Sequence, residues 1–275
     1  MSDAAVACRS SAWMNGLATT PRPIFAIGDV HGRADLLAAL HREIQSIAAA
    51  DSLLDPLVIH LGDYIDRGSR PLACLEMALD GLPGIETISL PGNHEQMMRR
   101  ALETEGPDRD GTLEIWLLWN GGDRVAVELG MPDGAAAIRN ADQFVARLKA
   151  RLARRLDRFR EMPSHVRLGG YLFVHAGINP AISLTEQLGK PWGKMVEGDE
   201  DEDPLWVRGP FLLHDGAFEE GLIVVHGHTI RDAPEIEANR VGIDTGAYRS
   251  GRLTCLELCG DQMRFITTTD GQASF

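Results

Sequence analysis

Residues 24–32 read IFAIGDVHG, four apolar residues that run into a glycine, an aspartate and a histidine. The pattern predicts a short buried strand over Ile24–Ile27 that ends at Gly28. Apolar residues then recur at three- and four-residue intervals from Ala34 to about Ala50, which predicts a helix. This stretch therefore forms a strand, a polar loop and a helix.

The same pattern repeats twice more along the chain. Leu57–Leu61 is a second apolar run, and the helix predicted after it, from Pro71 to about Leu79, begins with a proline, a common first helical residue. Ile85–Leu90 is a third run, and it stops at Pro91-Gly92 before another helix. Strands that alternate with helices predict an α/β (α+β) fold that carries polar residues beyond the carboxyl ends of its strands.

The remainder divides into a helical part and a strand-rich part. Apolar stripes at helical spacing run from about residue 110 to residue 162, and we interpret this segment as a helical insertion. Tyr171–Val174 and Leu222–Val225 predict two strands, each followed by a histidine. Two further runs around Gly260-Asp261 predict a terminal hairpin.

Length and composition fit one globular domain. The chain has 275 residues, of which 44% are hydrophobic and 24% charged, values that argue against disorder and fibrous architecture. Residues 1–22 lack the apolar segment of a signal peptide, and we expect a flexible lead-in there, followed by a single domain over residues 23–275. No apolar run reaches the roughly 20 residues of a membrane span.

Charge and cysteine content narrow the function classes further. The chain has 27 Lys and Arg residues and 40 Asp and Glu residues. The resulting net charge of −13 disfavours binding to a nucleic-acid backbone. The four cysteines are too scattered for a disulfide framework, and we expect a cytoplasmic protein. Glu197–Asp203 holds six carboxylates in seven positions, which predicts an exposed loop.

Five polar motifs follow predicted strands. They are Gly28-Asp29-Val30-His31-Gly32, Gly62-Asp63-Tyr64-Ile65-Asp66-Arg67-Gly68, Gly92-Asn93-His94-Glu95, His175-Ala176-Gly177 and His226-Gly227-His228. Taken singly, each has an ordinary explanation, because Asp, Asn and Gly are common turn residues and a lone histidine is most often a hydrogen-bonded structural residue. Five such motifs in the same structural position indicate one shared site.

The residue types in these motifs indicate a metal centre. Imidazole combined with carboxylate suits manganese, iron or zinc, whereas magnesium and calcium favour all-oxygen sites. The donors outnumber what one ion needs, and two ions roughly 3.5–4 Å apart hold and activate a hydroxide for in-line displacement at phosphorus. We therefore expect a binuclear hydrolase with two divalent ions, in the first place Mn²⁺, with Fe or Zn as alternatives.

In this order, the motifs GDVHG, GDYIDRG, GNHE, HAG and HGH resemble those of the metallophosphoesterases, specifically the phosphoprotein phosphatase family with its bacterial and phage serine/threonine protein phosphatases. The resemblance implies a calcineurin-like fold, a central β-sandwich flanked by helices. It leaves His226 without a ligand counterpart. The implied ligands are Asp29 and His31 for the first metal, Asp63 as the bridge, and Asn93, His175 and His228 for the second metal.

The resemblance and the chemistry together suggest roles for the remaining site residues. His94 follows the ligand Asn93 and is the expected general acid that protonates the leaving oxygen. Asp66 is expected to hydrogen-bond His94 and to raise the pKa of its ring. Arg67 and Asn93 are expected to bind the phosphate, and Arg208 resembles the second phosphate-binding arginine of bacterial members.

These features favour a phosphomonoesterase, in the first place a serine/threonine protein phosphatase acting on a phosphoprotein or a small phosphoester. The alternative is a symmetrical dinucleoside tetraphosphate hydrolase, a class that usually lacks the aspartate found here at Asp66 and ends the third motif in aspartate rather than Glu95. A broad phosphodiesterase fits less well, because Ile230 stands where a second histidine would complete GHxH. A non-catalytic binding module would have lost a ligand or His94, and neither is lost.

Overall fold

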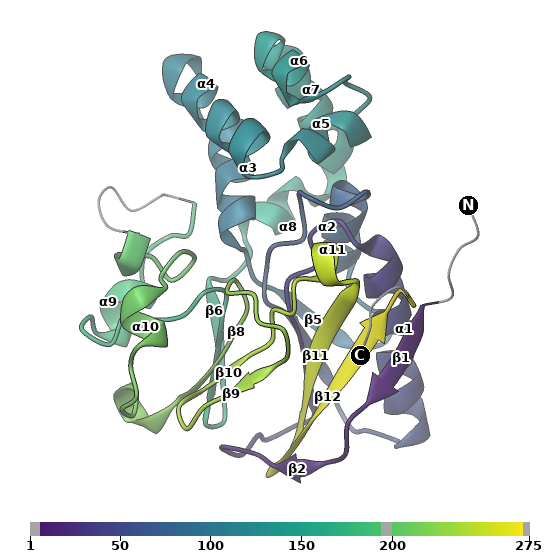
Figure 1. Ribbon diagram of the computed structural model, residues 1–275, viewed down its shortest axis with the longest axis vertical. Coiled ribbons are helices and arrows are strands. Elements are labelled where there is room, and N and C mark those ends of the chain that lie inside the picture. Colours follow the sequence, from purple (N-terminus) through teal and green to yellow (C-terminus); the bar gives the residue numbers. More distant parts are fainter. Residues whose placement is uncertain (1–5, 194–199, 272–275) are drawn as a thin grey trace.

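Two β-sheets lie face to face at the centre of the molecule, with helices on their outer faces and a layer of helices at one end (Figure 1). The computed structural model describes residues 6–193 and 200–271. The seven-stranded sheet runs in the order β1 (Ala7–Ser10), β12 (Gln262–Thr269), β11 (Arg252–Cys259), β3 (Ile24–Ile27), β4 (Leu57–His60) and β5 (Glu86–Ser89), with β2 (Met14–Asn15) paired to β12. The five-stranded sheet runs β6 (His165–Leu168), β7 (Tyr171–Val174), β8 (Ile223–His226), β10 (Arg240–Gly242) and β9 (Glu235–Ile236). The predicted β-sandwich is confirmed.

Strand β3 shows how the two layers of core are built. Its side chains alternate, as the two-residue period of a strand requires. Ile24 and Ala26 belong to the apolar cluster between the sheets, whereas Phe25 and Ile27 belong to the cluster under the outer helices. All four are fully buried, which explains why this strand reads as a continuous apolar run rather than an alternating one.

Helices cover the sandwich on both sides and at one end (Figure 1). The first sheet carries α1 (Ala34–Ala50) and α2 (Pro71–Asp80), the second carries α9 (Leu184–Leu188) and α10 (Gly209–Leu212), and α11 (Ala247–Ser250) precedes β11. Between β5 and β6 lie α3 (Asn93–Glu103), α4 (Gly106–Glu114), a π-helical turn (Ile115–Trp119), α5 (Asp123–Glu128), α6 (Gly134–Arg139), α7 (Ala141–Leu152) and α8 (Leu156–Arg160). The segment 110–162 is thus helical as predicted, although α4 begins a turn earlier.

Strand direction brings the polar motifs together. β3, β4 and β5 run parallel in one sheet, and β7, β8 and β10 run parallel in the other. Parallel strands end at the same edge of their sheet, and the crossover helices return the chain to the opposite edge. The loops after β3, β4, β7 and β8 therefore gather at one rim of the sandwich.

The N-terminal segment is more ordered than expected. Residues 1–5 lie outside the described residues, but β1 pairs antiparallel with β12, and β2 pairs with the start of β12. The hydroxyl of Tyr171 accepts hydrogen bonds from the backbone N–H groups of Leu17 and Ala18. The prediction of a flexible lead-in is therefore wrong for this part, because pairing to an existing sheet edge supplies the order that its local sequence does not encode.

The acidic block also departs from the prediction at one residue. Glu197–Asp199 lie outside the described residues, and Glu200–Glu202 form a partly exposed 3₁₀ turn. Asp203, however, is buried, and its carboxylate accepts hydrogen bonds from the Gln96 side chain at 3.1 Å and from the Leu205 N–H at 2.9 Å. Two donors inside the fold stabilise this carboxylate, so the expected exposed loop ends before Asp203.

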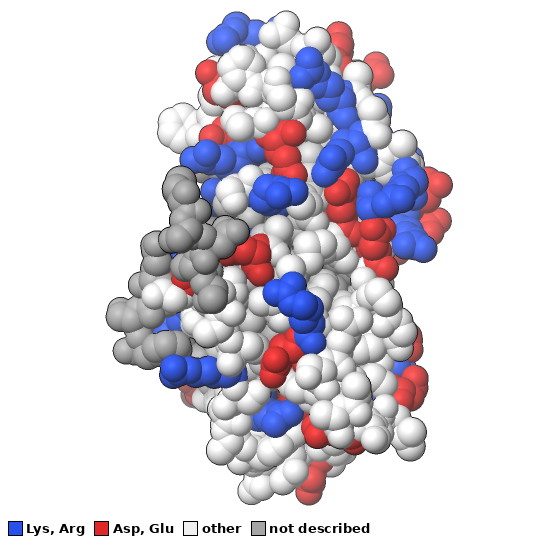
Figure 2. Space-filling model, turned by 90° about the vertical axis from the view of Figure 1, so that its right-hand side faces the viewer, with Lys and Arg blue, Asp and Glu red and all other residues white. Residues whose placement is uncertain are grey.

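Surface charge is mixed on the face that Figure 2 shows, where basic and acidic side chains lie interspersed. The arginines at the end of the helical layer illustrate this, since Arg151 and Arg155 both pair with Glu76, and Arg155 also pairs with Asp80. Across the described residues no helix is long and apolar enough to cross a membrane.

Candidate active site

The predicted site residues meet at the rim formed by the strand ends. Asp29 and His31 follow β3, Asp63 follows β4, Asn93 and His94 open α3, and His175 and His228 follow β7 and β8. All seven side chains are buried. The structure thus brings together segments that lie up to 199 positions apart in the chain, the separation of the Asp29 and His228 pair.

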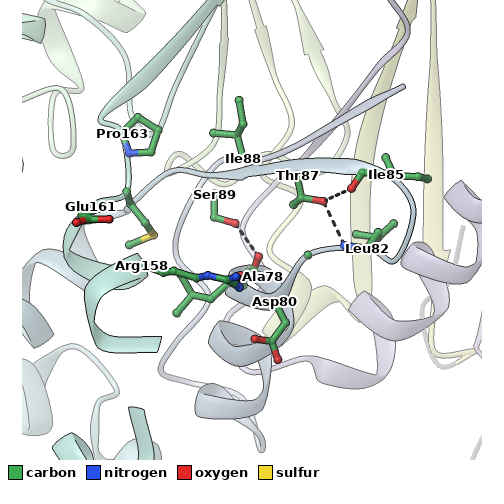
Figure 3. Close-up of a pocket in the computed structure, with 13 residues that line it drawn as sticks. Ala78, Asp80, Leu82, Ile85, Thr87, Ile88, Ser89, Arg158, Glu161 and Pro163 are labelled. Atoms are coloured by element: carbon green, nitrogen blue, oxygen red, sulfur yellow. Dashed lines mark hydrogen bonds between the residues drawn. The ribbon is translucent and has the colours of Figure 1, made fainter. Parts of the chain in front are cut away.

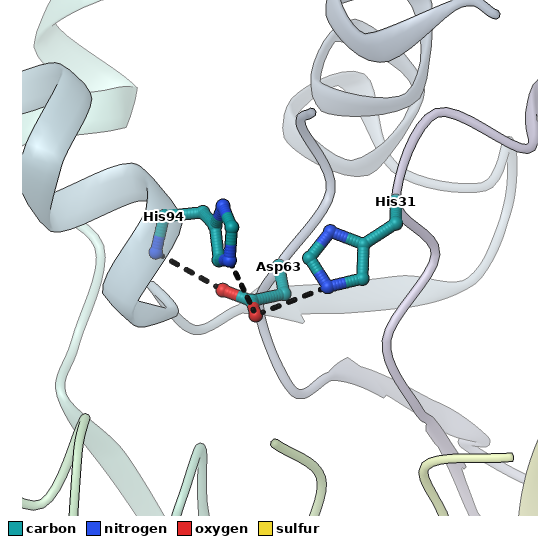
Figure 4. A group of neighbouring side chains, drawn as sticks. All are labelled: His31, Asp63 and His94. Carbon is teal, nitrogen blue, oxygen red and sulfur yellow. Dashed lines mark hydrogen bonds and ion pairs between the residues drawn. The ribbon is translucent and has the colours of Figure 1, made fainter. Parts of the chain in front are cut away.

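Asp63 lies at the centre of this group. Figure 4 shows His31 and His94 on either side of its carboxylate. Asp63 Oδ2 is 3.3 Å from His31 Nε2 and 3.8 Å from His94 Nε2, and Asp63 Oδ1 is 3.5 Å from His175 Nε2. One carboxylate therefore reaches two sets of imidazoles, as a bridging ligand must.

Two overlapping groups of side chains have the spacing of a metal site. His31, Asp63 and His94 form the first, and Asp63, His175 and His228 form the second, with the ligand atoms of each group within 4.8 Å of one another. Asn93 adds an oxygen to the second group, because its Oδ1 lies 3.0 Å from His175 Nε2 and 3.0 Å from His228 Nδ1.

The outer nitrogens of three imidazoles are held by backbone carbonyls. The pairs are His31 Nδ1 with Ile65 O at 2.8 Å, His175 Nδ1 with Leu61 O at 2.8 Å, and His228 Nε2 with Trp206 O at 3.2 Å. A carbonyl only accepts, so each of these nitrogens carries the proton and the other ring nitrogen presents a lone pair to the site. This arrangement is typical of histidines that bind a metal.

Asp29 supplies a test of whether a cation fits. Its Oδ2 accepts the N–H of His228 at 2.9 Å, but its Oδ1 is buried without a hydrogen-bond partner among the described residues. Burial, together with the carboxylates of Asp244 and Asp63, raises the pKa of Asp29 well above its ordinary range. A divalent cation would satisfy the bare oxygen and offset the crowded negative charge, so these residues fit a pair of metal ions.

Asp244 is a site residue that the sequence analysis missed. It is buried, accepts the N–H of Gly246 at 2.9 Å, and is close enough to Asp29 to raise the pKa of that carboxyl. A signal was available, because Ile243-Asp244-Thr245-Gly246 repeats the pattern of an apolar strand followed by an aspartate and a glycine. The short strand β10 made this sixth motif hard to recognise.

His94 and Asp66 form a close pair. His94 Nδ1 lies 2.5 Å from Asp66 Oδ2, which also accepts the indole N–H of Trp116 at 2.8 Å. The predicted hydrogen bond is present, but the predicted rise in pKa is not. Burial lowers the pKa of His94 to about 3, and the nearby charges of His31 and Arg67 add to this. Burial also raises the pKa of Asp66 well above its ordinary range.

Two arginines line the pocket above these residues, a cavity of about 330 Å³. Arg67 lies 2.9 Å from His31 Nε2 and 3.1 Å from His94 Nε2, and its guanidinium stacks over the ring of Tyr248. Arg208 donates to the hydroxyl of Thr229 at 2.9 Å. The backbone N–H of Arg208 donates to Asp201 Oδ1, but among the described residues neither guanidinium group is ion-paired with a carboxylate, so both present positive charge to the pocket.

Glu95 holds two of the site loops together. Its carboxylate accepts four backbone N–H groups, those of Gly92, Asp63, Tyr64 and Ile65, at 2.8–3.2 Å. A carboxylate with four donors fixes the loop after β4 against the start of α3. Glu95 thus sets the position of Asp63, a larger role than the third motif alone indicated.

Backbone geometry at the rim is unusual. Five functional residues have a left-handed backbone, which non-glycine residues seldom adopt, and they are His31 (φ 43°), Asp63 (52°), Asp66 (74°), Arg67 (61°) and His228 (62°). Gly92 is needed for close packing, since a Cβ there would lie 2.1 Å from Asp63 Oδ1. The loops at the rim thus adopt unfavourable backbone dihedrals and pack closely around the carboxylate of Asp63.

Other features lie apart from this site. A cavity of about 520 Å³ opens beside β5 and the ends of α2 and α8, and none of the predicted site residues lines it (Figure 3). His226 is buried, its Nδ1 donates to Gly227 O at 3.0 Å, and it belongs to neither metal group among the described residues. Neither feature is part of the two metal groups at the rim.

The fold and the shared carboxylate define a metal-dependent phosphoesterase. The sequence model of the calcineurin-like phosphoesterases matches residues 22–245, and the chain belongs to this family. It is 27% identical to serine/threonine-protein phosphatase 2 of Escherichia coli (strain K12) over 85% of this chain and 91% of that protein. It is 25% identical to the asymmetrical bis(5'-nucleosyl)-tetraphosphatase PrpE of Anoxybacillus flavithermus over 84% of this chain and 88% of that protein.

A solved structure supports the fold. A cold-active protein tyrosine phosphatase superposes with a TM-score of 0.52 at 18% identity, and the match covers 86% of this chain and 75% of that one. Identity at this level speaks for the architecture of the sandwich and not for the substrate.

Proposed function

We propose that this protein is a serine/threonine protein phosphatase that hydrolyses phosphomonoesters. The observation that carries the proposal is the His94–Asp66 pair, held at 2.5 Å beside the shared carboxylate of Asp63. A phosphomonoester leaves as an alkoxide, which needs a proton, and an imidazole next to the metal groups is suited to deliver one. The resemblance to a bacterial serine/threonine-protein phosphatase points the same way.

The metal ligands would be Asp29, His31, Asp63, Asn93, His175 and His228. Two divalent ions bound by them would supply an activated water as the nucleophile and offset the charge of the phosphate. Arg67 and Arg208 face the same pocket and would bind non-bridging phosphate oxygens through their planar forks, with Asn93 contributing its side-chain N–H. Arg67 would turn from the ring nitrogens of His31 and His94 toward the phosphate.

His94 would act at its Nε2, the nitrogen that faces Asp63 and Arg67. Asp66 keeps the ring oriented through Nδ1, and Trp116 fixes Asp66 in turn. The low pKa of His94 describes the pocket without substrate. A dianionic phosphate close to Nε2 stabilises the imidazolium and raises the pKa of His94, so the proton would be taken up with the substrate and passed to the leaving oxygen.

The second candidate function is hydrolysis of dinucleoside tetraphosphates. It rests on the relative of that name, which is 25% identical over most of both chains. Asp66 argues for the phosphatase over a symmetrical tetraphosphate hydrolase, because the resemblance places this aspartate in the phosphoprotein phosphatases and usually not in the symmetrical hydrolases. Both functions would use the same metal ligands.

Three substrates separate these functions. Purified protein is assayed with Mn²⁺, Fe²⁺ or Zn²⁺ against p-nitrophenyl phosphate, a phosphoserine peptide and diadenosine tetraphosphate, with kcat/KM measured for each. We expect turnover of the first two and a higher kcat/KM for the peptide than for the dinucleotide. A clear preference for the dinucleotide would overturn the protein-phosphatase proposal, and no turnover with any metal would overturn the enzymatic proposal altogether.

A further inference from the structure

A third arginine stands at the mouth of the same pocket. Arg249 lines the cavity together with Arg67 and Arg208, but unlike the ligands below it, Arg249 is exposed. It lies on α11, directly after Tyr248, whose ring packs against both Arg67 and His31. The pocket therefore has two arginines near the metal groups and one at its rim.

The backbone around α11 fixes where Arg249 lies. This four-residue helix is bounded by Gly246 and Gly251, both in the left-handed conformation at φ 69° and 68°. A Cβ built on Gly246 would lie 2.9 Å from Ile230 Cγ2 and 3.2 Å from Arg249 Nε. The Arg249 side chain thus lies close to the backbone of Gly246, whose other near neighbour is Ile230, and both side chains line the pocket.

Arg249 and Arg208 flank one short segment. Arg208 donates to Thr229, and the next residue, Ile230, lies close to Gly246, as Arg249 does. Thr229 and Ile230 also line the pocket. Both arginines therefore line the pocket that this segment also lines.

Arg249 carries unneutralised charge. Neighbouring arginines are occupied, because Arg231 pairs with Glu235 and Arg252 donates to the carbonyl of Asp232. The side chain of Arg249 has no ion pair or hydrogen bond with any residue in the described ranges 6–193 and 200–271. In a chain with 40 acidic and 27 basic residues, an arginine held at a pocket mouth without a carboxylate partner is available to a ligand.

One phosphate group does not need this third arginine. The forks of Arg67 and Arg208 and the metal groups already account for the non-bridging oxygens of a single phosphoryl group. We propose that Arg249 binds a second anionic group of the substrate, next to the phosphate that is cleaved. This inference rests on the proposed function and adds its substrate class, either a phosphopeptide with an acidic residue beside the phosphoserine or a polyphosphate chain.

The experiment measures a preference rather than an absolute rate. Two phosphoserine peptides that differ only in Glu or Gln after the phosphoserine are compared by kcat/KM, and diadenosine tetraphosphate is compared with p-nitrophenyl phosphate. We expect Arg249→Ala to reduce the preference for the two-anion substrate roughly tenfold, between the effect of an exposed ion pair and that of a charge-assisted hydrogen bond. Arg249→Glu should reverse the preference between the peptides.

A matched control uses an exposed arginine that follows the pocket residue Ile230 in the chain. Arg231→Ala removes an exposed arginine that is already paired with Glu235 and does not line the pocket, and it should leave both preferences unchanged. Melting temperatures of all variants show whether the fold is intact, and Arg249 is exposed enough for its replacement to be tolerated.

Each outcome decides the inference. Loss of the peptide preference identifies a carboxylate as the second anion, and loss of the dinucleotide preference alone identifies a phosphate. If wild-type protein shows no preference, or if Arg249→Ala keeps it, the inference is overturned while the phosphatase proposal stands. If wild-type protein turns over none of the four substrates, the proposed function fails and this inference fails with it.

Discussion

Two groups of buried histidines in this molecule differ in what their ring nitrogens contact. In the core, His41 of α1 and His60 of β4 contact each other through their Nε2 atoms at 2.9 Å, and His60 Nδ1 lies 3.3 Å from the Ser89 hydroxyl. At the rim, the imidazoles surround the carboxylate of Asp63. Both groups are buried, yet only the second has a charge at its centre.

The comparison shows what burial of a histidine does and does not indicate. His41 and His60 hydrogen-bond to each other, so the lone pair at their shared contact is used within the pair and is not offered to a ligand. At the rim, backbone carbonyls hold the outer nitrogens and leave the inner nitrogens pointing at one shared carboxylate. The partner of the second ring nitrogen, rather than burial, separates a metal-binding imidazole from a structural one.

The largest effect is expected at the shared carboxylate. Asp63→Asn removes the charge that both metal groups use, so we expect metal content to fall and kcat to drop on the order of 10⁴-fold or more, since several kcal/mol of transition-state stabilisation is lost. Metal analysis and steady-state kinetics on the same preparation measure both. Asp55→Asn is the matched control, because that side chain is 74% exposed and pairs only at the surface with Arg22. A fully active, metal-loaded Asp63→Asn protein would refute the bridging role.

A smaller loss of kcat is expected when His94 is replaced. The variant tests whether His94 differs from the other histidines around Asp63, which are His31, His175 and His228 and which we call, with His94 and Asp63, the rim group. His94→Asn should keep metal content near that of the wild type and lower kcat on the order of 10²–10⁴-fold, the size of a general-acid contribution. The loss should be greater for phenyl phosphate than for p-nitrophenyl phosphate, because the poorer leaving group depends more on the proton. Loss of metal instead would show that His94 is a ligand, as its proximity to His31 and Asp63 allows.

The smallest effect on catalysis is expected for the core pair, His41 and His60. Replacing His41 should change the stability of the fold rather than kcat. Burial lowers the pKa of His41 to about 4, from about 6.5 in the unfolded chain. Below pH 6.5 the unfolded chain binds more protons than the folded protein, so the free energy of unfolding falls as the pH drops from 6.5 through 4. His41 accounts for up to about 3 kcal/mol of this loss.

His41→Gln tests this origin of the acid sensitivity. The variant should show a flatter dependence of the unfolding free energy on pH between 6.5 and 4, measured by urea denaturation at several pH values. Its kcat at pH 7.5 should stay within about twofold of wild type, because His41 is not part of the rim group. An unchanged pH slope would show that other groups cause the acid sensitivity.

Much of the fold and most of the site followed from local sequence patterns. The strands at Ile24–Ile27 and Tyr171–Val174 and the helix at Ala34–Ala50 are confirmed at the predicted residues, because each has an apolar period that its environment agrees with. The motif residues meet because parallel strands end at one rim. The position of each polar motif directly after a predicted strand indicated that convergence.

What the sequence did not reveal depends on partners distant in the chain. β1 is ordered by β12, which lies at the other end of the sequence, so no local pattern marks it. The burial of Asp203 depends on Gln96, and the low pKa of His94 depends on desolvation, which only the assembled pocket defines. Asp244 was detectable in principle, but its strand of three residues gave too short a pattern.

Five residues at the rim have a left-handed backbone conformation. At these positions, a substitution that stabilises the fold is expected to lower activity. Glycine adopts such dihedrals freely, whereas another L-residue pays roughly 1–2 kcal/mol. Replacing Asp66 or Arg67 by glycine would relieve this strain and would also remove the hydrogen-bond partner of His94 or the guanidinium proposed to bind the phosphate. Directed evolution for thermostability alone would therefore enrich better-folding and less active variants at these positions, and a library built on this scaffold needs an activity screen alongside the thermal one.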